Sequence, residues 1–308
     1  MSVKRTSTHT LGNHTGKLPL VSVVVPTKNS AGTIEKCLKS ILEQTYPKIE
    51  VVVVDGLSRD NTRKIADELK ARIVTSPSKR SEARNMGAGL SKGDYLLFID
   101  SDMELDPVVI AECMEMVDRG CDALIIPEIS VGQGFWAKCR ALEKSFYVGN
   151  DLIEAARFFK KMAFHAVGGF DTNLQAGEDW DISIRLRKAG FNFGRTERLI
   201  IHHEGNLSLR EAVTKKYQYG KTVNLYERKH PEEARAQLGI SRLMLFRNVK
   251  KLRERPQYAI GLIMMKACEY LFLGISSRTP TDPNNQSLDR PSQSTVLGIR
   301  LPKNRKAT

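Results

Sequence analysis

The sequence predicts an α/β fold in which a mostly parallel, doubly wound sheet is flanked by helices. Four short β-branched or apolar runs alternate with helical patterns between residues 21 and 102. Each run stops at polar or charged residues, and no internal repeat is present. Strand-helix-strand units of this kind form parallel sheets with right-handed crossovers, and such sheets bind ligands at the carboxyl ends of their strands.

The expected elements follow from these runs in chain order. Residues 21–25 are rich in valine, and we expect Pro26 to stop this strand because proline cannot donate to a ladder. Asn29 or Ser30 then opens a helix. We expect strands at 21–25, 49–54, 71–75, 95–100, 123–129 and 199–201, and helices that begin near residues 30, 62, 81, 107, 135 and 178.

The strand that starts at Tyr95 ends in two carboxylates one residue apart. Asp100 and Asp102 would repel each other at the edge of a sheet unless a cation lies near them. Hard oxygen donors suit Mg²⁺ or Mn²⁺, so we expect a divalent metal here. The structural alternative, a helix cap, applies better to Asp106, which precedes Pro107.

Charge separates the chain into a near-neutral body and basic ends. The net charge of +13 over 308 residues divides into +3 for residues 1–20, −1 for 21–203 and +11 for 204–308. A neutral body argues against a nucleic-acid groove, whereas a basic C-terminal third fits an anionic membrane surface. Five cysteines without a C-x-x-C pair indicate neither a disulfide framework nor a zinc site, and the N-terminus lacks a signal-peptide pattern. We therefore expect a cytoplasmic location.

The composition predicts four regions. A flexible tail over 1–19 precedes an α/β domain over 20–205. A helical region over 206–275 then precedes a disordered basic tail over 276–308, which is rich in Pro, Ser and Asn.

The helical region has the composition of an interfacial membrane helix. Six basic residues and one acid occupy positions 242–255, and an apolar stretch follows that Lys266 and Glu269 interrupt. We expect a helix that lies on an anionic membrane on the cytoplasmic face and does not span it. Packing of this helix on the α/β domain is the alternative.

Polar residues at three strand ends should meet at one edge of the sheet. A nucleotide placed there could have its base read by Asp55, its diphosphate bridged by a metal on Asp102, and its remaining charge met by Arg84. The G-x-G-x-x-G and G-x-x-x-x-G-K-[ST] fingerprints are both absent from the sequence, which argues against the common dinucleotide and P-loop sites.

Six short motifs occur in a fixed order along the α/β domain. They are Val-Val-Val-Pro-Thr-Lys-Asn at 23–29, Asp-Gly-Leu-Ser-Arg-Asp-Asn-Thr at 55–62, Ala-Arg-Asn-Met-Gly at 83–87, Asp-Ser-Asp at 100–102, Gly-Gly-Phe-Asp at 168–171 and Glu-Asp-Trp-Asp at 178–181. In this order they resemble the inverting family 2 nucleotide-sugar glycosyltransferases. The resemblance implies the GT-A fold and a divalent cofactor, Mg²⁺ or Mn²⁺. It also implies the transfer of a hexose from a nucleotide sugar, with a UDP-sugar favoured over a GDP-sugar. The implied acceptor is a saccharide or a lipid-linked acceptor such as a polyprenyl phosphate.

The resemblance also implies roles for individual residues. Asp55 would contact the base, Asp100 would lie near the ribose and the metal, and Asp102 would ligate the metal. One of the two adjacent histidines after the last strand would be a second metal ligand, and we favour His202 over His203. The implied donor-binding set is Pro26, Thr27, Asn29, Asp55, Arg84, Asp100 and Ser101.

Asp179 is the catalytic base that the resemblance implies. A helix N-terminus favours its charged form, whereas Glu178 beside it disfavours that form. Judged without the resemblance, both residues are ordinary acids of a first helical turn. If the acceptor is a lipid phosphate, which is already anionic, a strong base is unnecessary.

Two rival functions account for fewer residues. A haloacid-dehalogenase-like phosphatase also ends a strand in D-x-D, but that family has Thr or Val where this chain has Glu104. A basic membrane-binding module without catalysis explains the C-terminal charge and leaves the strand-end acids unexplained.

Overall fold

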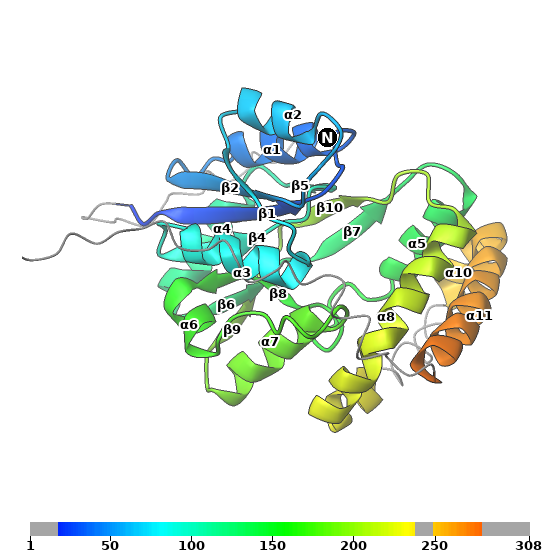
Figure 1. Cartoon of the computed structure of the whole chain (residues 1–308). Coiled ribbons are helices and arrows are strands. Elements are labelled where there is room, and N and C mark those ends of the chain that lie inside the picture. Colours follow the sequence, from blue (N-terminus) through cyan, green and yellow to red (C-terminus); the bar gives the residue numbers. More distant parts are fainter. Residues whose placement is uncertain (1–17, 238–248, 279–308) are drawn as a thin grey trace, which may run out of the picture.

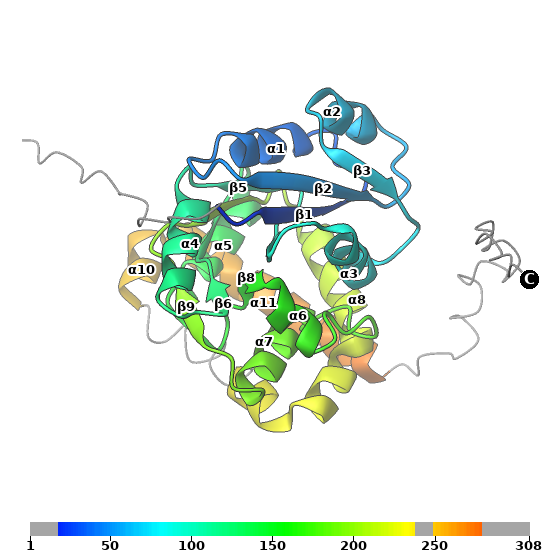
Figure 2. The same cartoon turned by 90° about the vertical axis from the view of Figure 1, so that its left-hand side faces the viewer.

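The structure, a computed structural model, describes residues 18–237 and 249–278. Its main sheet has seven strands: β1 (Val21–Thr27), β2 (Ile49–Asp55), β3 (Arg72–Thr75), β4 (Tyr95–Phe98), β6 (Ala123–Ile125), β8 (Ala156–Lys160) and β9 (Phe193–Arg195). Their order is β3-β2-β1-β4-β8-β6-β9, and β3 is labelled in Figure 2 and the other six strands in Figure 1. The first four are parallel, as the alternation predicts, whereas β8 is antiparallel to both of its neighbours.

β1 runs through Pro26, so the prediction that this proline ends the strand is wrong. Pro26 is opposite Val54 of β2. The carbonyl of Thr27 accepts a hydrogen bond from Gly56, which follows β2. Successive residues of a strand direct their backbone groups to opposite neighbours, so the backbone of Pro26 faces β4. Pairing between β1 and β4 stops at Val24. The missing N–H therefore removes no ladder hydrogen bond, and β1 extends to the edge where β2 ends.

A second, three-stranded sheet consists of β5 (Met103–Leu105), β10 (Ile200–His203) and β7 (Glu128–Val131), with β10 in the middle. Its β10 pairs antiparallel with β5 and parallel with β7. The single strand expected over 123–129 is therefore wrong, because β6 belongs to the main sheet and β7 to the small one. Pro127 lies at the break, and its carbonyl accepts the N–H of Ile200. This arrangement brings the end of β10 next to the chain that leaves β4.

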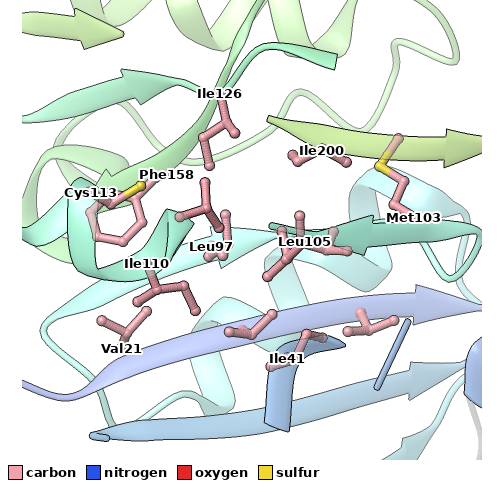
Figure 3. Close-up of a cluster of buried hydrophobic side chains, with 14 of the residues drawn as sticks. Val21, Ile41, Leu97, Met103, Leu105, Ile110, Cys113, Ile126, Phe158 and Ile200 are labelled. Carbon is pink, nitrogen blue, oxygen red and sulfur yellow. The ribbon is translucent and has the colours of Figure 1, made fainter. Parts of the chain in front are cut away.

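Helices cover both faces of the main sheet (Figure 2). Alternate residues of β1 point to opposite faces. Val23 and Val25 pack in one cluster with residues of α1, α2 and α4, and Figure 3 shows Leu97 and Ile110 in the same cluster. Val24 packs on the other face with residues of α3, α6 and α7. The helices are α1 (Ile34–Leu42), α2 (Thr62–Glu68), α3 (Arg80–Leu90), α4 (Val109–Asp118), α6 (Lys161–Ala166) and α7 (Glu178–Lys188).

The remaining helices form one group beside the sheets: α5 (Phe135–Lys144), α8 (Leu209–Lys229), α10 (Val249–Glu254) and α11 (Pro256–Arg278) (Figure 1). Leu262 and Met265 of α11 pack with Leu142 of α5 and Ala212 of α8. The expected start of a disordered tail at residue 276 falls inside α11. The rest of that tail, and nearly all of the expected N-terminal tail, lie outside the described residues.

Two charged residues of α11, Lys266 and Glu269, face the protein. Lys266 pairs with Glu143, and Glu269 pairs with Arg140, both on α5. By length and composition α11 is long and apolar enough over Pro256–Ile275 to cross a membrane, although Lys266 and Glu269 interrupt this stretch. The opposite side, called here the outer face of α11, is exposed and consists of Ile260, Ile263, Met264, Leu271, Phe272 and Ile275.

Candidate active site

The strand ends open into one cavity of about 670 Å³. Because β1 pairs in register with β2 and β4, the residues that follow these strands lie close together. The start of α7 and the end of β10 also contribute to its lining, and α5, α8 and α11 form a further wall. The expected site residues that line the cavity are Pro26, Thr27, Asp100, Ser101, Asp102, Asp179 and His202.

Asp102 and His202 face each other at this cavity. His202 Nε2 lies 3.3 Å from Asp102 Oδ2, and Nδ1 lies 2.8 Å from a carboxylate oxygen of Glu128 on β7. Burial lowers the pKa of His202, but the hydrogen bonds to Asp102 and Glu128 outweigh burial and raise the pKa to about 9. His203 instead pairs with Glu104 of β5 at 2.8 Å. Of the two adjacent histidines, His202 is the one that lies beside Asp102.

Asp102 and His202 could bind a divalent cation if a nucleotide supplies its remaining ligands. No group of three or more His, Cys, Asp or Glu side chains arranged for a metal occurs within residues 18–237 and 249–278. Mg²⁺ usually keeps several waters and takes one or two protein carboxylates together with phosphate oxygens. The Asp102 side chain is 42% exposed and therefore open to such a ligand. The bond from His202 Nδ1 to Glu128 leaves Nε2 as the nitrogen available for a metal.

Arg84 is almost fully buried and is surrounded by carboxylates. Its guanidinium donates to Asp100 at 2.9 Å, to Asp179 at 2.8 Å and to Glu178 at 3.3 Å. The two terminal nitrogens of Arg84 donate to these carboxylates, its Nε has no partner among the described residues, and Arg84 does not line the cavity. That Arg84 meets the charge of a diphosphate therefore stays a prediction. The cations that do line the cavity are Lys28, Arg80, Arg140, Lys144, Arg157, Lys215 and Lys216.

Asp100 is held in its charged form by cations on three sides. Burial raises the pKa of Asp100, but Arg84, Arg80 and Arg157 together hold it well below its usual range. Next to it, Ser101 donates a hydrogen bond to Ser30 at 2.8 Å, which ties the loop after β4 to the loop after β1. Asp100 therefore belongs to the ion-pair network and also lines the cavity.

Glu178 and Asp179 begin α7 in different surroundings. Burial, together with the charge of Asp179, raises the pKa of Glu178 to about 7 against the opposing effect of Arg84 and Arg80. The Asp179 side chain lines the cavity, is 33% exposed and pairs with Arg84. Of the two neighbouring acids, Asp179 is the more accessible to an acceptor.

Asp55 and Asn29 lie in the loops behind the cavity lining. Asp55 is fully buried, and its Oδ2 accepts the N–H of Ser58 at 3.0 Å. Its Oδ1 has no hydrogen-bond partner among the described residues, and a buried acceptor without a donor is costly. Asn29 accepts the N–H of Arg59 and so joins the loop after β1 to the loop after β2. Asp55 therefore keeps one acceptor oxygen for a ligand, whereas the side-chain oxygen of Asn29 is already bonded.

Glu128 and Arg157 belong to the site but were missed from the sequence. Glu128 accepts a hydrogen bond from Arg157 at 2.8 Å and one from Lys144 at 3.4 Å. Arg157 lies on β8, a strand that the sequence analysis did not predict. A sequence feature that could have identified them is a charged residue close to a short apolar run. Glu128 follows Ile125-Ile126 in this way, and Arg157 precedes Phe158-Phe159.

Residues 22–170 match the family model described as glycosyl transferase family 2. This match covers just under half of the chain, and over it the chain resembles the family 2 glycosyltransferases. The resemblance drawn from six motifs is thereby confirmed, as are the GT-A fold and the assignment to the glycosyltransferases. The phosphatase and the non-catalytic membrane module are not supported.

Similar proteins include glycosyltransferases from bacteria and archaea. The chondroitin synthase of Pasteurella multocida is 25% identical over 228 residues, which cover 69% of this chain and 24% of that protein. The glycosyltransferase AglE of Haloferax volcanii is 42% identical over 97 residues, which cover 29% of this chain and 32% of that protein. The chain thus matches only 24% to 32% of the length of these relatives.

A solved structure shares the fold. The mannosyltransferase PcManGT from Pyrobaculum calidifontis, in complex with GDP-Man and Mn²⁺, superposes with a TM-score of 0.58 over 86% of this chain and 88% of that one. At 19% sequence identity this likeness shows the GT-A fold alone. The shared fold agrees with the family match.

Proposed function

We propose that this glycosyltransferase moves a hexose from a nucleoside diphosphate sugar to a lipid-linked acceptor, with inversion at the anomeric carbon. The observation that carries the proposal is that Asp102, His202 and Asp179 line one cavity at the carboxyl edge of the sheet. A metal-binding pair and an accessible carboxylate are the groups that direct displacement of a nucleoside diphosphate requires.

On the donor side, Asp55 offers its unpaired Oδ1 to an N–H of the nucleotide base. Pro26, Thr27 and Ser101 line the cavity where the ribose and diphosphate would lie. Asp102 and His202 would hold Mg²⁺ or Mn²⁺, which when bound neutralises the charge that develops on the departing diphosphate. We favour UDP over GDP as the nucleotide.

On the acceptor side, Asp179 takes the proton of a hydroxyl acceptor. Its ion pair with Arg84, at 2.8 Å, holds the carboxylate in a fixed orientation and leaves a third of the side chain exposed to the cavity. A base so held is ready to accept a proton without rearrangement. If the acceptor is a phosphate oxygen, this proton transfer is not needed.

We also propose that the chain sits on an anionic membrane through the outer face of α11. A helix that turns its charges inward and its apolar side chains outward is the reverse of a soluble surface helix. Lys250, Lys251, Arg253 and Arg255 lie on or next to α10, just before the apolar stretch, and would contact anionic lipid. Arg242 and Arg247, the other two basic residues of this segment, lie outside the described residues.

The cytoplasmic face is the proposed side of the membrane. All five cysteines lie in the described residues, and each is free. Free buried thiols are typical of proteins kept in a reducing compartment.

The experiment that tests the proposed reaction is nucleotide release from a panel of UDP-sugars and GDP-sugars with Mn²⁺. We expect release from one of these donors, and we expect a chelator to stop it. Asp102→Ala serves as the paired negative control. If no donor of either nucleotide is turned over, with or without a lipid-linked acceptor, the proposed reaction is wrong.

A further inference from the structure

One wall of the cavity is built by helices that lie outside the strand-end motifs. On α8, Ala212, Lys216, Tyr219 and Val223 all line the cavity. Their spacing of four, three and four residues places them on one side of the helix. A lysine in the middle of an inward-facing stripe needs a reason, because an apolar residue would pack there at lower cost.

The carboxylates nearest to Lys216 are already bonded to other cations. Glu143 pairs with both Arg140 and Lys266, and Glu269 pairs with the same two cations. Three cations, including Lys216, therefore share two carboxylates.

Lys216 itself has no ion-pair partner among the residues that the structure describes. Its contact is with the ring of Tyr219, whose centroid lies 6.0 Å from Nζ. Burial, with the charge of Lys266, lowers the pKa of Lys216 to about 8, although Glu269 and Glu143 act in the opposite direction. An anion bound beside Lys216 would relieve this uncompensated charge.

The rest of this wall combines a second cation with apolar side chains. Lys215 lines the cavity and is exposed. Leu207 before α8, Val223 of α8 and Leu273 of α11 line the same cavity. Leu273 belongs to the helix whose outer face is the proposed membrane contact. A cationic wall bordered by aliphatic side chains suits a phosphate attached to a hydrocarbon better than it suits a nucleotide.

We propose that Lys216, with Lys215, binds a phosphate group of the acceptor at the wall formed by α8 and α11. This inference rests on the proposed function, because it takes the cavity to be the site of glycosyl transfer. The inference specifies that the lipid-linked acceptor carries a phosphate. It also assigns a role to Lys215 and Lys216, which lie beyond residue 170, where the family match ends.

The test measures equilibrium binding to the full chain by calorimetry with three probes. Farnesyl phosphate carries both a phosphate and an aliphatic chain, farnesol carries the chain alone, and glycerol 3-phosphate carries the phosphate alone. We expect Lys216→Gln to weaken farnesyl phosphate binding by about 10- to 100-fold and to leave farnesol binding unchanged. Lys216→Arg keeps the charge and should retain most of the affinity.

Lys221→Gln is the matched control. It removes a cation from the exposed side of the same helix, outside the cavity, and should bind farnesyl phosphate as the wild type does. Thermal unfolding of each variant shows whether the fold is intact. If glycerol 3-phosphate binds as tightly as farnesyl phosphate, and both depend on Lys216, the phosphate site stands and the acceptor is soluble.

Two results would overturn the inference. One is wild-type affinity of Lys216→Gln for every phosphate probe. The other is an equal loss of UDP affinity in this variant, which would assign Lys216 to the donor diphosphate. Because the binding measurements need no sugar donor, failure of the donor panel would refute the proposed reaction without deciding this inference.

Discussion

Asp100, Asp102, Glu178 and Asp179 are four of the carboxylates that line the active-site cavity, and the groups around each one determine what it can bind. Asp100 is compensated by arginines, and Glu178 is buried and resists ionisation. Asp102 and Asp179 are the more exposed pair, at 42% and 33% of the side chain. The exposed pair is therefore the one available to a metal and an acceptor.

Asp102→Ala should abolish nearly all sugar transfer, because it removes a carboxylate from the proposed metal pair. The fold should persist, since this exposed side chain contributes little to the core. Mn²⁺ affinity, measured by calorimetry with UDP present, should fall together with transfer. Glu104→Ala is the control, because Glu104 pairs with His203 and does not line the cavity. Transfer near the wild-type rate in Asp102→Ala would contradict the metal assignment.

Asp179→Asn should lower turnover with a hydroxyl acceptor by about 10²- to 10⁴-fold, because the amide cannot take the proton. UDP affinity should change little, which separates a loss of chemistry from a loss of donor binding. Steady-state kinetics measure the turnover, and calorimetry measures the UDP affinity of the same variant. Unchanged turnover with a hydroxyl acceptor would disprove the role of base, and unchanged turnover with a phosphate acceptor would agree with the Lys216 inference.

Glu178 should make the stability of the chain depend on pH. Burial raises its pKa from the ordinary glutamate value of 4.5 to about 7 in the folded chain, so the folded state binds the proton more tightly. This stabilisation is complete below the unfolded pKa and is lost as pH rises through 7, a change of roughly 3 kcal/mol. Urea denaturation between about pH 5 and 8 should show this decline in the wild type relative to Glu178→Gln. Parallel pH profiles for the two proteins would refute it.

At the scale of elements, α3 lies close against β1 because Gly87 has no side chain. A Cβ on Gly87 would lie 2.3 Å from a methyl carbon of Val24. This contact fixes α3, and α3 carries Arg84 to the carboxylates of the site. The glycine of the Ala-Arg-Asn-Met-Gly motif thus has a packing role in placing the arginine.

Gly87→Ala should lower the free energy of unfolding by about 1 to 3 kcal/mol, because the helix must move away from the sheet. Gly89→Ala is a matched control on the same helix, where a Cβ would meet nothing within 4 Å. That change should be neutral or should stabilise by up to about 1 kcal/mol, since alanine favours helix. Urea denaturation of both variants makes the comparison, and equal effects would contradict the packing role.

At the scale of the whole molecule, the helical group of α5, α8, α10 and α11 joins the catalytic cavity to the outer face of α11. The inner side of α11 contacts α5 through ion pairs, and α5 and α8 line the cavity. A chain that sits on the membrane by its outer face would therefore hold the acceptor wall close to lipid.

The full chain should co-sediment with anionic vesicles, and Ile263→Ser with Leu271→Ser should reduce this binding. Both residues belong to the outer face and are more than half exposed, so their loss should not affect folding. Met162→Ser is the control, because Met162 on α6 is 71% exposed but distant from α11 in sequence. High salt should weaken binding as well, since each basic residue near the surface contributes about 1 kcal/mol. Equal sedimentation of the double variant and the wild type would contradict a membrane contact through α11.

The sequence by itself determined the order of the first strands and helices, the acids at the strand ends and the family. These features depend on neighbours along the chain: β-branched runs predict strands, and parallel strands end at one edge. His202 was favoured because it directly follows the apolar strand, and adjacent residues of a strand face opposite sides, so at most one of the two histidines should reach the metal. Local patterns therefore identified Asp100, Asp102 and His202, which line the cavity, but not Glu128 on β7 or Arg157 on β8.

Only the tertiary structure decided which charges meet. Arg84 was expected to bind a ligand, but its two terminal nitrogens donate to acids up to 95 residues away in sequence, at Asp179. The direction of the charged side of α11 depends in the same way on Arg140 and Glu143, which lie more than a hundred residues earlier. Local sequence periodicity contains no information about such distant partners, and a buried charge is stable only beside the partner that the fold brings to it.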